Sequence, residues 1–145
     1  MEIQLRKGDE LTLANYEEIF SLANEWWSTI SNIPLNKEDV FSLIDRLKDT
    51  FLSYTEKGSV IAYSACLVTS HIFNRDYVTC NVISLVIKEN FKNTRLFYRM
   101  LKDIDMLVKE YKINNFTITF FDNIKEKNLT KFGYIKKASE YVKEV

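Results

Sequence analysis

The sequence predicts an α+β fold, a mixed sheet flanked by helices, in the order β-α-α-β-β-β-α-β-α-β-β. Stretches with apolar residues at steps of three and four alternate with β-rich runs, and turn signals join three of those runs in succession. Hydrophobic residues make up 46% of the 145 residues, enough for a buried core. We expect residues 1–145 to form a single domain.

The first part of the chain predicts a strand followed by two helices. Residues 2–6 (EIQLR) alternate between apolar and polar, as a strand does. Apolar residues at helical spacing then run over 13–30, and Pro34 ends this pattern because it disfavours helical backbone in the residue before it. Asn36 is typical of a helix N-cap, and the second helix is expected to reach about Asp49.

The middle of the chain predicts three consecutive antiparallel strands. The runs 51–56 and 59–73 are joined by Lys57 and Gly58, where glycine is free to take a positive φ. Residues 74–76 (NRD) are expected to form the next turn, leading into a strand over 77–87. Strands joined by turns this short pair in antiparallel fashion.

The second half predicts one long helix and then shorter elements. An apolar stripe over 97–111 faces a charged stripe, which is typical of an amphipathic helix. A β-rich strand is expected over 116–122 and a short helix over 123–132, with Gly133 as its left-handed C-cap. The tail, 134–145, can supply two short strands.

Composition excludes several classes of protein. Twenty basic residues balance twenty acidic ones, so no nucleic-acid partner is expected. The longest apolar run, 60–68, is far shorter than a membrane span, and the polar N-terminus predicts a soluble, cytoplasmic protein. Cys66 and Cys80 lie in apolar runs as reduced core thiols, and the single histidine, His71, predicts no metal site.

Two segments resemble the GNAT superfamily of acyl-CoA N-acyltransferases, as does the element order over nearly the whole chain. The segment 85–101 (LVIKENFKNTRLFYRML) is similar to the family's strand, loop and helix signature, (Arg/Gln)-x-x-Gly-x-(Gly/Ala). The segment 121–137 (FDNIKEKNLTKFGYIKK) resembles the family's Asn-containing helix that closes on Gly-Phe and a strand.

The resemblance implies a cofactor, a reaction and a set of binding residues. The cofactor would be acetyl-CoA, and the reaction would be acetyl transfer to a primary amine. Pantetheine would bind strand backbone, and the pyrophosphate would bind the loop and the N-terminus of the following helix. On this chain the corresponding cofactor-binding residues are Leu85, Val86, Ile87, Lys92, Asn93, Thr94 and Arg95.

The phosphate loop departs from the family pattern. With Lys92 at the Arg/Gln position, the glycine positions hold Arg95 and Phe97. One interpretation is that Phe97 turns inward and the loop is only a helix N-terminus capped by Asn93 or Thr94. The other is a working cofactor loop in which Lys92 or Arg95 attracts the phosphates.

The usual proton-transfer groups are absent too, so no catalytic residue is assigned. Leu129 stands where the family has a tyrosine, and the strand 77–87 contains no Asp or Glu as general base. Ser84 or Cys80 could orient a water or a thioester. Tyr134 follows the glycine and is expected to pack.

Two functions remain open. The first is a divergent N-acetyltransferase that takes an acyl-CoA and an amine acceptor, with residues 25–27 (EWW) either lining the acceptor pocket or packing Trp27 in the core. The second is a non-catalytic GNAT-fold protein that has lost the cofactor site. Such a protein would act on a protein partner or in an assembly, through exposed aromatic residues and a C-terminal edge strand, with a homodimer as one form.

Overall fold

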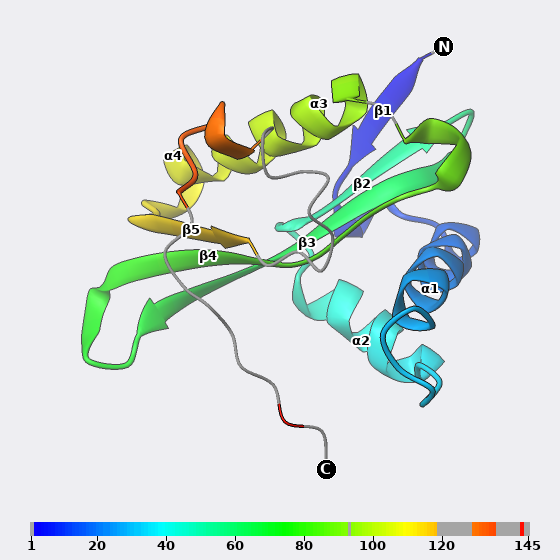
Figure 1. The fold of residues 1–145 in the computed structure, drawn as a ribbon, viewed down its shortest axis with the longest axis horizontal. Coiled ribbons are helices and arrows are strands. Elements are labelled where there is room, and N and C mark those ends of the chain that lie inside the picture. Colours follow the sequence, from blue (N-terminus) through cyan, green and yellow to red (C-terminus); the bar gives the residue numbers. More distant parts are fainter. Residues whose placement is uncertain (1, 93, 119–128, 136–142, 144–145) are drawn as a thin grey trace.

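Figure 1 shows the computed structural model, which describes residues 2–92, 94–118, 129–135 and 143. Its five-stranded sheet has the order β1-β2-β3-β4-β5. Neighbouring strands pair in antiparallel fashion from β1 to β4, whereas β4 and β5 are parallel. The predicted mixed sheet is therefore confirmed. The strands are β1 (Ile3–Arg6), β2 (Phe51–Glu56), β3 (Ser59–His71), β4 (Asn74–Ile87) and β5 (Asn115–Ile118).

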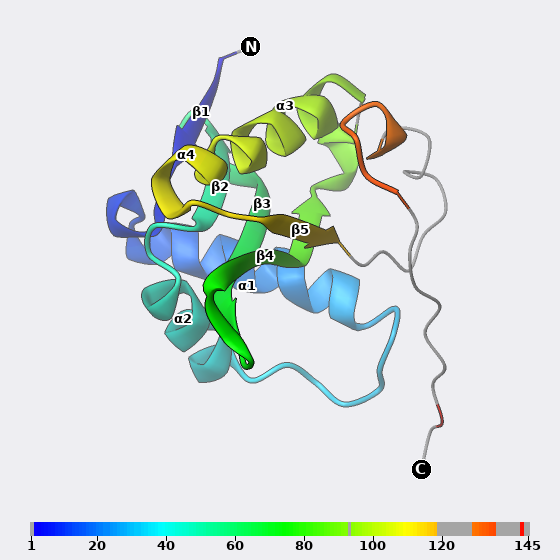
Figure 2. The same cartoon turned by 90° about the vertical axis from the view of Figure 1, so that its left-hand side faces the viewer.

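Helices cover both faces of this sheet. Figures 1 and 2 show α1 and α2 on one face and α3 and α4 on the other. Short 3₁₀ turns precede α1 and α3, at Gly8–Glu10 and Glu89–Phe91. The helices are α1 (Leu13–Trp27), α2 (Lys37–Arg46), α3 (Thr94–Asp105) and α4 (Leu107–Tyr111).

Local sequence explains where the first two helices begin. The side chain of Thr12 accepts a hydrogen bond from the Asn15 N–H, and the Asn15 side chain accepts one from the Thr12 N–H. This reciprocal pair satisfies N–H groups that a helix start leaves unpaired. The Asn36 side chain accepts from the Asp39 N–H at 3.1 Å, so the predicted N-cap of α2 is confirmed.

Helix α1 ends earlier than the apolar pattern predicts. Its last residue is Trp27, and the pattern that continues to Ile30 lies in a turn. The indole N–H of Trp27 donates to the Ile33 carbonyl at 2.6 Å. This hydrogen bond anchors the segment that connects α1 to α2. Trp27 is only half-buried, so the expectation that it packs in the core is wrong.

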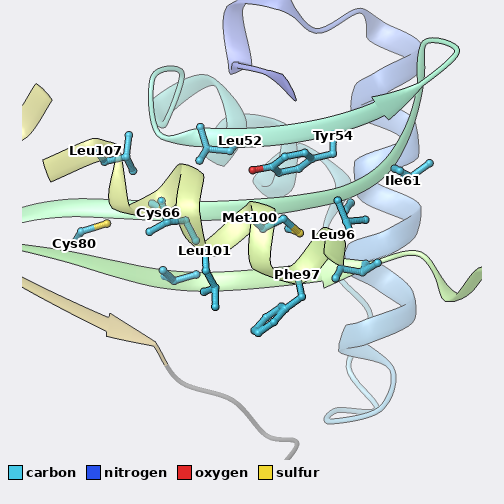
Figure 3. Close-up of a cluster of buried hydrophobic side chains, with 14 of the residues drawn as sticks. Leu52, Tyr54, Ile61, Cys66, Cys80, Leu96, Phe97, Met100, Leu101 and Leu107 are labelled. Atoms are coloured by element: carbon cyan, nitrogen blue, oxygen red, sulfur yellow. The ribbon is translucent and has the colours of Figure 1, made fainter. Parts of the chain in front are cut away.

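The alternation of residues in the strands builds one core on each face. The α1-side core contains Ile19, Leu22, Ala23, Ile44, Leu47, Phe51, Val60, Tyr63 and Ala65. The α3-side core includes Leu52, Tyr54, Ile61, Cys66, Cys80, Val82, Leu96, Phe97, Met100, Leu101, Ile104 and Leu107 (Figure 3). Neighbours such as Phe51 and Leu52 point to opposite faces, because side chains alternate along a strand.

Two predicted boundaries need correction. The turn between β3 and β4 is centred on Ile72 and Phe73 rather than on 74–76, and residues 75–77 bulge from the β4 register just after it. The long helix predicted over 97–111 is interrupted at Met106. Asn and Asp favour turns, so Asn74 and Asp76 misled the prediction, whereas the tip itself is apolar.

The end of the chain is described only in part. The short helix predicted over 123–132 is described from Leu129 onward, and the two tail strands lie outside the described residues apart from 134, 135 and 143. Gly133 has φ +86°, with its N–H bonded to the Thr130 carbonyl and the Tyr134 N–H bonded to the Leu129 carbonyl. This is a Schellman motif, so the predicted left-handed C-cap is confirmed.

Candidate functional site

A β-bulge in β4 lies where the described pairing with β5 ends. Strand β4 pairs with β5 from Thr79 to Val82. On its other side, Cys66 of β3 pairs with Val82 and Ala65 pairs with Ser84, which leaves Ile83 as an extra residue. A bulge bends its strand and increases the local twist. The end of β4 therefore bends just beyond the last paired residue of β5.

The three predicted pantetheine residues lie in this last segment of β4. Leu85, Val86 and Ile87 pair with Ser64, Tyr63 and Ala62 of β3, and no β5 residue that the structure describes pairs with them. Leu85 and Ile87 pack on the α3-side core, whereas Val86 packs on the α1-side core. The segment thus has one edge paired with β3, and no described residue pairs with its other edge.

The predicted phosphate residues lie between β4 and the start of α3. Lys92 is exposed and its ammonium group forms an ion pair with Glu89 at 2.9 Å. Arg95 is exposed on the first turn of α3. Asn93 lies outside the described residues, and only the backbone of Thr94 is described. The structure therefore brings two cations close to the helix start.

The backbone of this loop is partly used in its own turn. The Phe91 N–H donates to the Lys88 carbonyl at 2.8 Å, and the Lys92 N–H donates to the Glu89 carbonyl at 3.3 Å. These two N–H groups are therefore bonded within the 3₁₀ turn. A phosphate held here would depend more on the side chains of Lys92 and Arg95 than on a glycine-rich cradle.

Phe97 turns into the protein. Its side chain is 0% exposed and belongs to the α3-side core, so the interpretation in which the ring turns inward is confirmed. In Figure 3 the ring points away from Leu52 and Tyr54. Phe97 therefore fills space in the same core to which Leu85 and Ile87 of β4 belong.

The polar side chains considered for catalysis are engaged with each other. The Tyr63 hydroxyl and Ser84 Oγ are 2.9 Å apart, and burial raises the pKa of Tyr63 to about 12. Cys66 and Cys80 are free and fully buried, as predicted. The Cys66 thiol donates a hydrogen bond to Cys80, which together with burial raises the pKa of Cys66. Neither thiol is exposed as a nucleophile.

Sequence reasoning missed a polar group beside these thiols. The Tyr134 hydroxyl is buried without a hydrogen-bond partner among the described residues. Burial raises its pKa, with further contributions from Asp105, Cys80 and Cys66. The prediction of a packed Tyr134 did not foresee that its hydroxyl would be buried without a partner among the described residues, because burial of residue 134 depends on the fold. At the position where the family has a tyrosine, Leu129 packs on the α3-side core.

Other kinds of site find no support in the part of the chain that the structure describes. Within it, no three His, Cys, Asp or Glu residues are grouped as metal ligands would be. The described helices include none that is long and apolar enough to cross a membrane. His71 ends β3 and is exposed, with its Nδ1 accepting the Phe73 N–H at 3.1 Å.

Comparison with solved structures gives the clearest evidence on the fold, since no protein-family model and no curated protein matches the sequence. An acetyltransferase from Trypanosoma brucei aligns over 99% of this chain and 100% of its own, with TM-score 0.77 and 9% identity. A GNAT family acetyltransferase from Staphylococcus aureus aligns over 100% of both chains, with TM-score 0.67 and 15% identity. The chain has the GNAT fold.

A third GNAT-fold structure shows the same agreement. Glucosamine-6-phosphate N-acetyltransferase from Arabidopsis thaliana aligns over 99% of both chains with TM-score 0.76 and 11% identity. At identities this low, the alignments show a shared architecture only. The chemistry of this chain must be argued from its own residues. Within the GNAT fold, the segment from the bulge at Ile83 to Arg95 is the candidate site.

Proposed function

We propose that this chain binds acetyl-CoA at the bent end of β4 and transfers its acetyl group to a primary amine. The observation that carries the proposal is the bulge at Ile83, directly after the β4 residues whose pairing with β5 is described. An edge that leaves its neighbouring strand offers free backbone N–H and C=O groups to an amide-containing ligand. The GNAT fold supports this proposal as analogy.

The residues that would hold the cofactor follow from the geometry of the segment. The backbone of Leu85, Val86 and Ile87 would bind the pantetheine amides. The side chains of Lys92 and Arg95 would pair with the pyrophosphate, joined by Asn93 and Thr94 at the start of α3. Both cations are exposed, which leaves them accessible to a ligand.

The chemistry that the chain itself supplies would be mainly positioning. When bound, acetyl-CoA supplies an activated acyl group, and holding it beside an amine gives much of the rate by proximity. Ser84 bonds to Tyr63, and the raised pKa of Tyr63 keeps that hydroxyl protonated near neutral pH. No carboxylate lies on β4 between Tyr77 and Ile87 to act as base. We therefore expect slow turnover, with a rate that depends on the fraction of the acceptor amine that is already deprotonated in solution.

A second candidate function is favoured by Phe97. The fully buried ring stands at a position where the family pattern has glycine or alanine, and it belongs to the same core as Leu85 and Ile87 of β4. If the ring occupies the space that pantetheine needs, the chain is a binding or assembly protein that keeps the fold without the cofactor. A titration with acetyl-CoA separates the two functions.

The test is calorimetric and thermal titration of the whole chain with acetyl-CoA and with CoA. Under the proposal, ligand at 100 times its dissociation constant stabilises the folded state by about 2.7 kcal/mol. Release of free thiol from acetyl-CoA in the presence of primary amines would then report turnover. No heat and no thermal shift at millimolar cofactor would refute the proposal and favour the second candidate.

A charge-reversal pair identifies the phosphate contact. Arg95→Glu places a negative charge next to the proposed pyrophosphate, so we expect affinity to fall at least tenfold, about 1.4 kcal/mol. Lys109→Glu is the matched control, an equal charge reversal on an exposed helix position of α4. Equal affinities in the two variants would exclude Arg95 as a ligand of the cofactor.

A further inference from the structure

The β3–β4 hairpin extends beyond the rest of the sheet as a two-stranded arm. Described pairing of β2 with β3 ends at Ala65, and pairing of β5 with β4 begins only at Thr79. Figure 1 shows the arm, residues 67–77, projecting away from the helices. At its tip, Ile72 and Phe73 are 87% and 86% exposed. An isolated two-stranded hairpin is only marginally stable in water, so an arm that no described element covers is unusual.

The β3 edge of this arm has hydrogen-bonding groups directed outward. The Cys66 N–H donates to the Thr50 carbonyl, and the Cys66 carbonyl accepts from the Thr50 hydroxyl at 2.6 Å, so the backbone polar groups of Cys66 face the β2 side. Backbone groups alternate direction along a strand. Val68 and Ser70 therefore direct their N–H and C=O toward the same side, beyond the end of β2.

This edge lacks the features that keep strand edges from pairing. Residues 67–70 (LVTS) contain no charge, proline or glycine. The other arm strand is protected, because Arg75 and Asp76 lie in its bulged start. The outer edge of β1 carries Arg6, and the Arg99 guanidinium donates to the Ile3 carbonyl at 2.8 Å. Charged residues and bulges protect free strand edges in proteins from pairing with other strands. An edge that lacks these features therefore indicates a strand partner.

We propose that the β3 edge pairs with the β3 edge of a second copy of this chain, antiparallel and centred on Thr69. Around a two-fold axis at Thr69, Val68 of one copy faces Ser70 of the other. Both have outward backbone groups, so each such pair exchanges its N–H···O bonds. Thr69 faces Thr69 in a non-hydrogen-bonded pair, and Leu67 faces His71. The register is thus consistent with the direction of every backbone group on the edge.

Charge and the exposed backbone groups favour a second copy of the chain over a lipid surface as the partner of the β3 edge. The chain has a formal net charge of zero, so two copies do not repel, and the paired residues 67–70 bring no like charges together. A bilayer would leave the outward groups of Val68 and Ser70 without partners.

The experiment measures mass by light scattering and sedimentation over a concentration series of the whole chain. We expect a reversible dimer for the wild type. Thr69→Lys puts two ammonium groups opposite each other and should yield a monomer whose circular dichroism spectrum matches that of the wild type. Arg75→Glu, a charge change on the other strand of the same arm, is the matched control and should leave the dimer intact. A wild-type monomer at all concentrations, or a dimer that Thr69→Lys leaves unchanged, overturns the proposal.

Cross-linking tests the register itself. Across the two-fold, residue 69 faces its own copy at about 4.5 Å between Cα atoms, within the range for a disulfide. Thr69→Cys should therefore form an intermolecular disulfide with oxidised glutathione, which takes up the two electrons and two protons of the thiols. Cys66 and Cys80 are fully buried and should not react. Ser70→Cys, which faces Val68, should cross-link far more slowly. Equal cross-linking of the two variants, or none in either, overturns the register.

Discussion

Replacing Phe97 by alanine tests both the core and the candidate site. The ring is 0% exposed within the α3-side core, so its removal deletes buried contacts and leaves a cavity. The loss of transfer free energy and the cavity together cost about 3–5 kcal/mol for a buried phenylalanine. Alanine favours helix, so the position in α3 adds no helix penalty. We expect the free energy of unfolding to fall by that amount.

The assay is urea unfolding followed by tryptophan fluorescence and circular dichroism. Phe73→Ala is the matched control, since it removes the same ring from a site that is 86% exposed. At a concentration where the chain is monomeric, we expect the control to change stability by no more than about 0.5 kcal/mol. An equal slope against urea in both variants would show that the unfolded states are comparable.

The same variants report on the cofactor. If the Phe97 ring occupies space that pantetheine needs, Phe97→Ala should gain affinity for acetyl-CoA while Phe73→Ala does not. A loss of less than about 1 kcal/mol for Phe97→Ala would refute the reasoning, because no fully buried ring is removed so cheaply.

Two further predictions concern glycine and tyrosine. An alanine Cβ at Gly8 would lie 2.9 Å from Lys48 Cα, so Gly8→Ala should cost about 1–3 kcal/mol in unfolding assays. Gly58→Ala meets no atom within 4 Å and should cost only the strain of its φ of +80°, about 1–2 kcal/mol. A larger loss of stability for Gly58→Ala than for Gly8→Ala would contradict the packing argument. Burial raises the pKa of Tyr63 from 10.0 to about 12, so its contribution to stability is complete below about pH 10 and is lost as the pH rises toward about 12. Tyr63→Phe should therefore flatten the fall of unfolding free energy between about pH 10 and 12, and an unchanged slope would show that Tyr63 titrates normally.

Local signals in the sequence predicted most of the fold. The capping residue Asn36 and the helical spacing on α1, α2 and α3 depend on near neighbours in the chain, so residue type and periodicity reveal them. The same holds for the turn at Lys57 and Gly58 and for the C-cap at Gly133, where positive φ is needed. The turn at Ile72 and Phe73 escaped prediction because apolar residues carry no turn signal.

The site was predictable only as a segment. A resemblance over residues 85–101 placed Leu85 to Arg95 between a strand and a helix, and the structure has that arrangement. The bulge at Ile83 could not be foreseen, because it depends on how β4 aligns with β3. The approach of Tyr134 to the buried thiols depends likewise on residues far apart in the chain.

By itself, then, the sequence determined the order of the elements, the absence of charge on the β3 edge and the lack of glycine before α3. Each is a property of residue type and spacing. Tertiary structure decided that Phe97 is buried, that β4 carries a bulge at Ile83 and that the β3–β4 arm extends beyond the described pairing of β2 and β5. These features arise from strand register and packing between distant segments, which no local pattern encodes.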